Sequence, residues 1–521
     1  MSERARTADA PGAITPLAGT VTRPTLAESA ATRLHRVALR DSDTLLLAVL
    51  GLVAVALVVL MPMTFLQDTW LALVAGRVLW HSGLPHHEVL TTYSAGSAWI
   101  DQQWLSQLAM YGLWRLGGLG LVGVVHVALI ASGVAGAVVA ARRLGASAQS
   151  VMRLLPLCLW AVIFGSQVRT QAYAYPLFVA TVYLLAADSR SPSRRVYWCL
   201  PLLVLWANLH GSAILGAGLV GLRGLTFAWE HRRVLAHEAR SWGRPLLLTV
   251  GGPLCLMVTP YGPAVVSYYH DTLLNGSFRT FITEWQPVTS VPFLAVPFFV
   301  LAAIALWSFG RHAGRTTLWE RCALLALAVG GLTALRNVEW FALAALMLVS
   351  VSIDGAVRER GRRRRVRPRV NAALAAAALL GLAIVVSGTL GRPARSFERA
   401  YPRGVLDAVR SATSADPSLK VLADVKFGDW LLWHEPQLGG RIAYDARFEL
   451  LTARRLHQLM RLDKAVGLDW KQGARGYRLL VLDSKHFPDS ARGFRGEPGR
   501  RILYDDGDTS VILRSTNQAA A

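Results

Sequence analysis

The chain has 521 residues, of which 53% are apolar and only 17% are charged, with a mean hydropathy of +0.36. Apolar stretches close to the roughly 20 residues that cross a bilayer recur from Leu45 to about Ser387, which excludes a water-soluble, disordered, collagenous or disulfide-stapled protein. The net charge of +22 does not predict a nucleic-acid partner, because all 33 basic residues before residue 391 are arginines, mostly in short gaps between apolar runs.

The chain begins with a polar segment and continues with apolar ones. Residues 1–42 are rich in alanine, threonine and arginine and contain three prolines, so we predict a disordered cytoplasmic tail there. Residues 43–390 are predicted to form a transmembrane domain of about 11 helices. The predicted spans lie near residues 43–65, 119–141, 151–166, 173–187, 196–209, 212–229, 245–261, 291–310, 319–335, 341–353 and 370–389.

The arginines between the spans predict the orientation. With a cytoplasmic N-terminus, the inside segments hold 25 arginines and the outside segments hold five. Positive charge favours the cytoplasmic side, so we predict this orientation, and the polybasic run 358–369 is interpreted as a cytoplasmic stop signal attracted to membrane lipids. Abundant arginine, alanine, glycine and valine with little lysine suggest a bacterial plasma membrane as the location of this multi-pass protein.

The odd number of spans places residues 391–521 outside the cytoplasm. Short β-like runs at 420–424, 441–445, 478–483 and 509–514 alternate there with helical stretches such as Ala453–Leu462. This pattern predicts a small extracytoplasmic α/β domain, and its roughly 130 residues are enough to bury a core.

The longest predicted external loop, 66–118, contains two helical patterns, at Gln67–His81 and Asp101–Leu116. Both are amphipathic and fit helices that lie in the membrane interface. Asp68 and Asp101 stand near their starts, so helix capping is the structural alternative to a functional role for either carboxylate.

Polar residues gather at the predicted external ends of the spans. Ionisable groups at a membrane edge are costly and are therefore functional candidates. The candidates for an external site are Asp68, Asp101, Arg169, Gln171, Asn208, His210, Tyr261, Glu284, Arg336 and Asn337. Structural alternatives remain: an arginine at a span end can snorkel to the lipid headgroups, and His210 can make a structural hydrogen bond at a helix turn. The consecutive residues His86, His87 and Glu88 cannot all point at one metal ion.

Several motifs carry a resemblance to a known family. They are Asp68-Thr69-Trp70, Gly76-Arg77, Trp99-Ile100-Asp101-Gln102-Gln103-Trp104, Arg169-Thr170-Gln171, Trp206-Ala207-Asn208-Leu209-His210-Gly211, Thr259-Pro260-Tyr261-Gly262, Glu284-Trp285 and Arg336-Asn337. Over about 43–345 the chain resembles the GT-C superfamily of polytopic membrane glycosyltransferases, in particular a largely uncharacterised bacterial branch. Phe427-Gly428-Asp429-Trp430-Leu431 and Tyr444-Asp445-Ala446-Arg447 resemble the tail domain of the same branch.

The resemblance implies a GT-C-like fold and transfer of a hexose or pentose from a polyprenyl-phosphate-linked sugar to an extracytoplasmic glycan or lipid acceptor. It maps the general base, or acidic coordinating group, onto Asp68. Many members have two adjacent acidic residues there, whereas this chain has Gln67-Asp68. We therefore assign no metal ligand and no cofactor, and a divalent cation is possible but unsupported.

The residues suit this chemistry on their own terms. A carboxylate such as Asp68 can accept the proton of a sugar hydroxyl, and Arg169 and Arg336 can hold a phosphate. Asp429, Trp430, Asp445 and Arg447 are expected to cover the site and bind the acceptor, unless the tail domain is only a stabilising cap. The alternative class is non-catalytic: a transporter of lipid-linked glycans, or an assembly or scaffold protein.

Overall fold

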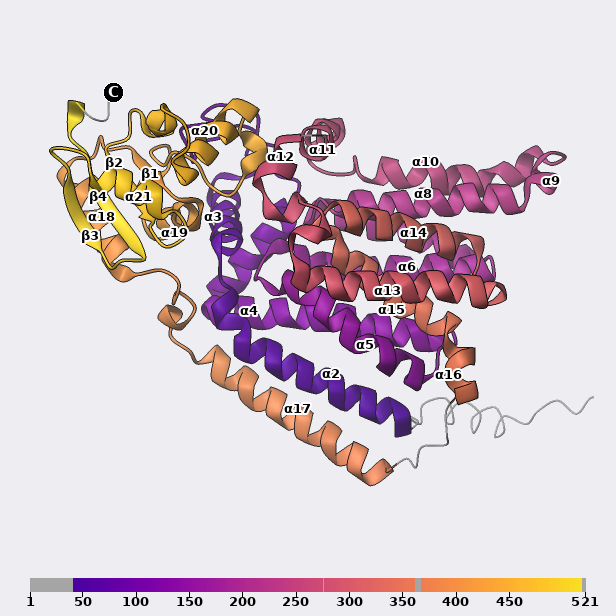
Figure 1. Cartoon of the computed structure of the whole chain (residues 1–521). Helices are drawn as coiled ribbons and strands as arrows, with labels where there is room; N and C mark the ends of the chain where they lie inside the picture. Colours follow the sequence, from indigo (N-terminus) through magenta and orange to yellow (C-terminus); the bar gives the residue numbers. More distant parts are fainter. Residues whose placement is uncertain (1–40, 275, 361–366, 518–521) are drawn as a thin grey trace, which may run out of the picture.

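The computed structural model describes residues 41–274, 276–360 and 367–517. Nearly all of the predicted tail and half of the polybasic run, residues 361–366, lie outside these residues. The described chain forms a bundle of helices, and an α/β unit sits at one end of that bundle (Figure 1).

Each predicted span contains one helix. These helices are α2 (Asp41–Leu60), α4 (Trp104–Arg143), α5 (Ala148–Val162), α6 (Ala174–Arg190), α7 (Cys199–Leu209), α8 (Ala213–Glu230), α10 (Gly243–Cys255), α13 (Pro292–Arg311), α14 (Leu318–Thr333), α15 (Val338–Ser352) and α17 (Pro368–Leu390). Among the described residues, five helical segments are long and apolar enough to cross a membrane: Asp43–Thr64, Trp104–Arg143, Pro292–Arg311, Leu335–Ser352 and Pro368–Leu390. That the shorter helices also cross stays a prediction.

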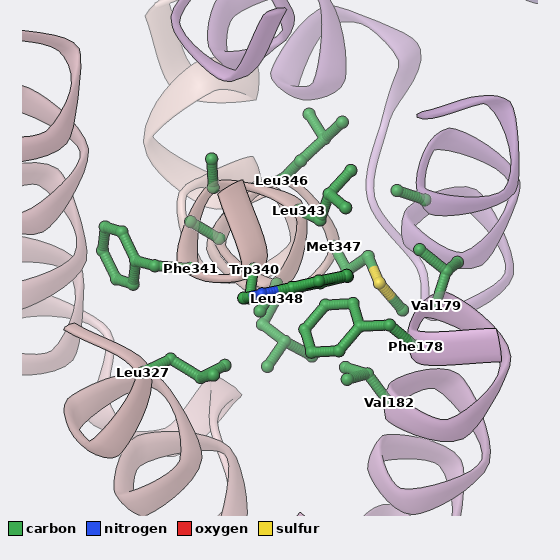
Figure 2. Close-up of a cluster of buried hydrophobic side chains, with 14 of the residues drawn as sticks. Phe178, Val179, Val182, Leu327, Trp340, Phe341, Leu343, Leu346, Met347 and Leu348 are labelled. Carbon is green, nitrogen blue, oxygen red and sulfur yellow. The ribbon is translucent and has the colours of Figure 1, made fainter. Parts of the chain in front are cut away.

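Helix α15 forms the centre of the bundle. All of its residues are buried, which explains why its sequence is apolar on nearly every face. Figure 2 shows Trp340 and Met347 of α15 beside Phe178 of α6, and the rings of Trp340 and Phe178 have centroids 5.1 Å apart. Leu327 of α14 lies on another side of α15. This core holds together the helix ends that carry the candidate site.

Residues 66–118, the predicted external loop, form helices where the two interfacial helices were predicted; that the loop is external and that these helices lie in the membrane interface stay predictions. The first is α3 (Gln67–Ser82), and the second is the start of α4, which breaks at Gly117 and Gly118 before the apolar part of α4 begins. Gly118 has φ +65°, a conformation that favours glycine. The capping alternative is wrong for both aspartates, because α3 and α4 have Leu66 and Gln103 at their N-cap positions and neither start has a side-chain cap.

The C-terminal α/β unit, residues 403–513, contains a four-stranded sheet in the order β1-β2-β4-β3. Its elements are α18 (Arg403–Ala415), β1 (Val421–Ala423), α19 (Val425–His434), α20 (Ala453–Lys464), β2 (Leu479–Asp483), α21 (Pro488–Arg495), β3 (Arg501–Asp505) and β4 (Thr509–Leu513). Strands β1 and β2 are parallel, while β4 is antiparallel to β2 and β3.

The predicted strands of this unit differ from the observed ones in two places. The run 441–445 forms only isolated bridges, in which Ile442 pairs with Val421 and Thr91. Strand β3 was not predicted, because it is an edge strand whose side chains are largely exposed and its sequence lacks a strong apolar pattern.

The C-terminal unit is fastened to the first external loop by buried polar contacts. Arg77 of α3 donates hydrogen bonds to the carbonyls of Trp433 (2.8 Å) and Leu432 (2.5 Å), at the end of α19. Arg447 forms ion pairs with Asp445 and with Glu88 of the loop (2.5 Å). The unit is thereby held directly above α3.

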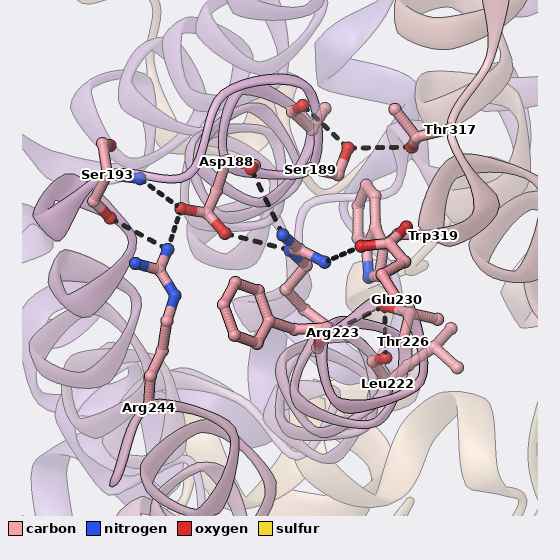
Figure 3. Close-up of polar contacts among 12 residues, drawn as sticks. Asp188, Ser189, Ser193, Leu222, Arg223, Thr226, Glu230, Arg244, Thr317 and Trp319 are labelled. Carbon is pink, nitrogen blue, oxygen red and sulfur yellow. Dashed lines mark hydrogen bonds and ion pairs between the residues drawn. The ribbon is translucent and has the colours of Figure 1, made fainter. Parts of the chain in front are cut away.

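A group of charged residues lies at the opposite end of the bundle, where Figure 1 places α9 (Arg232–Leu235) and α16 (Asp354–Arg360). We call Asp188, Arg223, Glu230 and Arg244 the far-end cluster. Figure 3 shows Asp188 between the two arginines, and its carboxylate also accepts a hydrogen bond from the Ser193 amide (2.9 Å). The gaps around Arg194 and Arg232 lie at this end, as expected for one side of a membrane; which side it faces stays a prediction.

Candidate functional site

A cavity of about 800 Å³ lies between the bundle and the C-terminal unit. Its wall contains seven of the ten predicted site residues, namely Asp68, Arg169, Gln171, His210, Glu284, Arg336 and Asn337. The structure therefore brings together polar residues that are as far as 269 positions apart in the sequence.

The bundle contributes these residues from places where apolar helices stop. Asp68 lies in the first turn of α3, and Arg169 precedes the short helix η3 (Thr170–Tyr173). His210 follows α7, while Glu284 and Arg336 lie in the single turns η7 (Thr283–Trp285) and η10 (Leu335–Asn337). Because the helices run side by side, their polar ends meet at the same end of the bundle.

Four charged residues of this wall, Asp68, Arg169, Glu284 and Arg336, form what we call the cavity cluster. Arg169 Nη1 lies 3.7 Å from Asp68 Oδ2 and also donates a hydrogen bond to the Glu284 carboxylate. The Arg169 residue is only 5% exposed, yet its Nε and Nη2 atoms have no hydrogen-bond partner among the described residues. Buried guanidinium groups normally pair all their donors, so Arg169 has free donors to offer a ligand.

Arg336 is the second cation of the cluster. Its guanidinium lies over the Trp285 ring, 4.7 Å from the centroid. An aromatic face holds an arginine in place without consuming its N–H donors. Both arginines can therefore present donors to an anion in the cavity.

The two carboxylates of the cluster are tuned in opposite directions. Burial, with the nearby Glu284 charge, raises the pKa of Asp68 above its ordinary value, although Arg169 and Arg336 oppose the shift. Burial alone would also raise the pKa of Glu284, but the charges of Arg169 and Arg336 lower it overall. Glu284 is thus the firmly ionised partner of Arg169, whereas Asp68 is the better proton acceptor.

His210 is neutral in this setting. Burial and the charges of Arg336 and Arg169 lower its pKa well below its ordinary value. Its Nδ1 accepts a hydrogen bond from the Ser212 amide (3.1 Å), so the ring carries its proton on Nε2. His210 can therefore make its structural hydrogen bond with Ser212 through Nδ1 and still offer the Nε2–H group to a ligand.

Gln171 connects the cavity wall to the bundle core. Its amide donates to the Glu339 carboxylate of α15, which also accepts a hydrogen bond from Tyr175 (2.6 Å). Glu339 is 3% exposed. This buried carboxylate holds Gln171 of the cavity wall in place through its hydrogen bond. Glu339 was not among the predicted site residues.

Three predicted site residues lie outside the cavity wall. Asn208 accepts a hydrogen bond from Trp104 (2.9 Å), and Tyr261 donates one to the Pro85 carbonyl (2.9 Å). Asp101 is buried, and burial raises its pKa to about 7. The two hydrogen bonds join residues 85 and 104 to segments of the bundle, and substrate binding by Asn208, Tyr261 and Asp101 stays a prediction.

The C-terminal unit also contributes to the wall. Its contributions are Val425, Ala446, Phe448, Glu449, Asp463 and Phe487. Burial raises the pKa of Glu449 to about 7 and, helped by the charge of Asp424, that of Asp463 to about 8. Sequence reasoning missed these residues, although Glu449 comes only two positions after the Tyr444–Arg447 motif.

The predicted acceptor-binding residues of the unit have other contacts. Asp429, Trp430, Asp445 and Arg447 are all at most 3% exposed. Asp445 and Arg447 pair with each other, and Arg447 stacks on the Trp99 ring, 4.2 Å from its centroid. Arg447 joins the unit to the loop through Glu88 and Trp99, whereas Asp429 accepts a hydrogen bond from the Ala446 amide inside the unit. Ala446 of the second motif lines the cavity.

Comparisons with known proteins find similarity only at the level of structure. No protein-family model matches the sequence, and no curated protein matches it. ArnT from Cupriavidus metallidurans bound to undecaprenyl phosphate is 15% identical, with 91% of this chain and 98% of that chain covered and a TM-score of 0.48. The archaeal oligosaccharyltransferase AglB from Archaeoglobus fulgidus, in complex with an inhibitory peptide and a dolichol-phosphate, is 12% identical, with 90% and 74% covered and a TM-score of 0.48.

A third similar structure is the arabinofuranosyltransferase AftD from mycobacteria, which is 16% identical. The match covers 90% of this chain and 40% of AftD, with a TM-score of 0.46. Identities and TM-scores this low neither assign the chain to a family nor transfer an activity to it.

Proposed function

We propose that the protein is a membrane glycosyltransferase of the GT-C type, which moves a sugar from a polyprenyl-phosphate donor to an extracytoplasmic glycan or lipid acceptor. The observation that carries the proposal is the buried Arg169, with two unpartnered nitrogens, beside the Asp68 carboxylate in one cavity. A phosphate would satisfy the free donors, and the carboxylate would accept a proton next to it.

The donor phosphate would bind to Arg169 and Arg336. A guanidinium presents several N–H donors that match phosphate oxygens. The cavity cluster has two arginines and two carboxylates, so its net charge is zero when both carboxylates are ionised. The phosphate would therefore be bound by N–H donors rather than by an excess of positive charge. The neutral His210 can add one further N–H donor.

The transfer would follow from this arrangement. The acceptor hydroxyl oxygen forms a bond to the anomeric carbon, and the bond between that carbon and the phosphate oxygen breaks. The hydroxyl proton passes to Asp68, while the electron pair of the broken bond remains on the phosphate, which the arginines stabilise. The raised pKa of Asp68 suits a group that has to take up a proton.

The acceptor would approach between the bundle and the C-terminal unit. Phe448 and Phe487 offer flat apolar faces in the cavity wall, and Glu449 and Asp463 offer hydrogen-bonding carboxyl groups. Aromatic faces beside carboxyl groups fit a hydroxyl-rich sugar. We therefore infer that the acceptor contacts these four residues rather than the docked side chains of Asp429, Trp430, Asp445 and Arg447.

The proposal includes the location. The cavity end of the bundle would face outward from a bacterial plasma membrane, and the arginine-rich far end would face the cytoplasm with the N-terminus. A transporter of lipid-linked glycans has to open a path at both ends. The far-end cluster of this chain is closed by ion pairs, which favours the enzyme over the transporter.

The test is a transfer assay with the full chain in proteoliposomes. Polyprenyl phosphates carrying radiolabelled hexoses or pentoses are supplied with cell-envelope glycans and lipids, and label in the acceptor fraction is measured. We expect transfer from at least one donor by the wild type and about 10²–10⁴-fold less by Asp68→Asn, with the exposed-surface variant Asp489→Asn as a matched control. Label that crosses the bilayer while still attached to its lipid would contradict the proposal and support a transporter.

A further inference from the structure

The cavity cluster raises the question of what cation stabilises the departing phosphate. In many phosphate-dependent reactions a divalent metal ion does so, held by two or more carboxylates. Asp68 and Glu284 are two carboxylates in the wall of one cavity. They are the obvious pair to test as metal ligands.

Arg169 occupies the space between these two carboxylates. Arg169 Nη1 contacts both Asp68 (3.7 Å) and Glu284. The guanidinium is buried between the carboxylates, and one of its nitrogens bridges them. A metal ion could bind both carboxylates only after displacing Arg169, which would leave a buried guanidinium without its partners.

The charge and the donors around this pair also disfavour a metal ion. Arg336 adds a second positive charge that acts on both carboxylates. The residue beside Asp68 is Gln67, a neutral amide, and the Nδ1 atom of His210 is engaged by Ser212. Within the described ranges no group of three or more His, Cys, Asp or Glu side chains is placed to hold a metal ion.

We propose that Arg169 takes the place of a divalent cation in this site. One of its nitrogens bridges Asp68 and Glu284, as a metal ion would, and its two unpartnered nitrogens serve the phosphate. Transfer then needs no divalent metal. The phosphate part of this statement rests on the proposed glycosyltransferase function, whereas the bridging part concerns the free protein alone.

The test of the bridging part is a titration with Mn²⁺, followed by electron paramagnetic resonance of the free ion. The full chain is purified in detergent, and the wild type is compared with Arg169→Ala. We expect Arg169→Ala to expose the carboxylate pair and bind one Mn²⁺ at least tenfold more tightly than the wild type. Adding Asp68→Asn to Arg169→Ala should abolish the gain, whereas adding Asp489→Asn, at an exposed residue outside the cavity wall, should not.

Two results would overturn the proposal. One is a wild-type protein that binds one Mn²⁺ tightly and loses it on Asp68→Asn or Glu284→Gln; this measurement does not depend on whether Arg169→Ala folds. The other is a folded Arg169→Ala protein that binds Mn²⁺ no better than the wild type.

An activity measurement separates this proposal from the proposed function. Where transfer is detected, a metal chelator should change its rate by less than about twofold, and a larger loss that Mn²⁺ restores would count against Arg169 as the cation. If no donor supports transfer, the proposed function fails, and the Mn²⁺ titration still decides whether Arg169 replaces a metal ion.

Discussion

The cavity cluster and the far-end cluster have the same composition, two arginines with one aspartate and one glutamate, but they use it differently. In the far-end cluster all three nitrogens of Arg223 have acceptors, which are Asp188 and Glu230 (Figure 3). In the cavity cluster Arg169 has two nitrogens without any. Arg244 of the far-end cluster also has one buried nitrogen, Nε, without an acceptor among the described residues. The comparison teaches that the fully paired Arg223 is satisfied within the protein, whereas Arg169 keeps two donors for a ligand in the cavity.

The largest effect is expected at Asp68. Asp68→Asn keeps the size of the side chain but removes the proton acceptor, so transfer should fall by about 10²–10⁴-fold. The amount of folded protein in the membrane should stay unchanged, because Asp68 is partly open to the cavity and caps no helix. A variant that keeps most of its activity would remove the catalytic role from the cavity cluster.

Arg223→Met should lower the stability of the protein and leave its activity unchanged, the reverse of what is expected for Asp68→Asn. Removing one partner of a buried ion pair costs about 3–5 kcal/mol of unfolding free energy, and Arg223 is fully buried against Asp188. Thermal unfolding of the purified protein should show this loss, while the folded fraction keeps its KM for the donor. If Arg169→Met proves as destabilising as Arg223→Met, the two clusters do not differ as proposed.

Asp463, a half-buried carboxyl group of the C-terminal unit, tests the effect of burial on a charge through the pH dependence of stability. The pKa of Asp463 is raised to about 8 by burial and by Asp424, so the folded state binds one proton more than the unfolded state between about pH 4 and 8. Stability should therefore fall as pH rises through this window, by at most about 1.4 kcal/mol per pH unit for one proton. Asp463→Asn should flatten the dependence of unfolding on pH; an unchanged profile would show that Asp463 is not the group responsible.

The smallest predicted effect is a shift of the pH–rate profile in the variant Arg336→Gln. The Arg336 charge lowers the pKa of Asp68, so Arg336→Gln should raise that pKa and move the acid limb of the pH–rate profile to higher pH. The sign follows because the base acts when deprotonated. The pH dependence of kcat/KM measures it, and a limb that moves to lower pH would contradict the assignment of Asp68 as the base.

Much of the bundle and of its side of the site could be predicted from sequence. Apolar runs of sufficient length identify helices, and the polar residues that interrupt them, such as Arg169 and Arg336, have to lie at helix ends. Helix ends on the same side of a bundle meet, so the cavity residues could be named before their partners were known. The pairing of Arg169 with Glu284 could not, because nothing in either segment indicates which helix ends are neighbours.

The C-terminal unit was harder to predict for a physical reason. Its motif residues Asp445 and Arg447 are used for docking, while the wall residues Glu449 and Asp463 become part of the site only because the unit packs on α3. Outside the apolar bundle, a charged residue has no costly environment that marks it as unusual. The apolar environment of a membrane bundle supplied that signal for Arg169.

The wall of the cavity includes Gln67 from near the start of the chain and Phe487 from near its end. During synthesis the bundle helices leave the ribosome before the C-terminal unit exists, and the polar ends of these helices stay uncovered until β2 and α21 have been made. A chain that stops before this point retains its apolar helices but has an open cavity. The bundle side of the wall, with Asp68, Arg169 and Arg336, is therefore synthesised before the side that carries Glu449, Asp463 and Phe487.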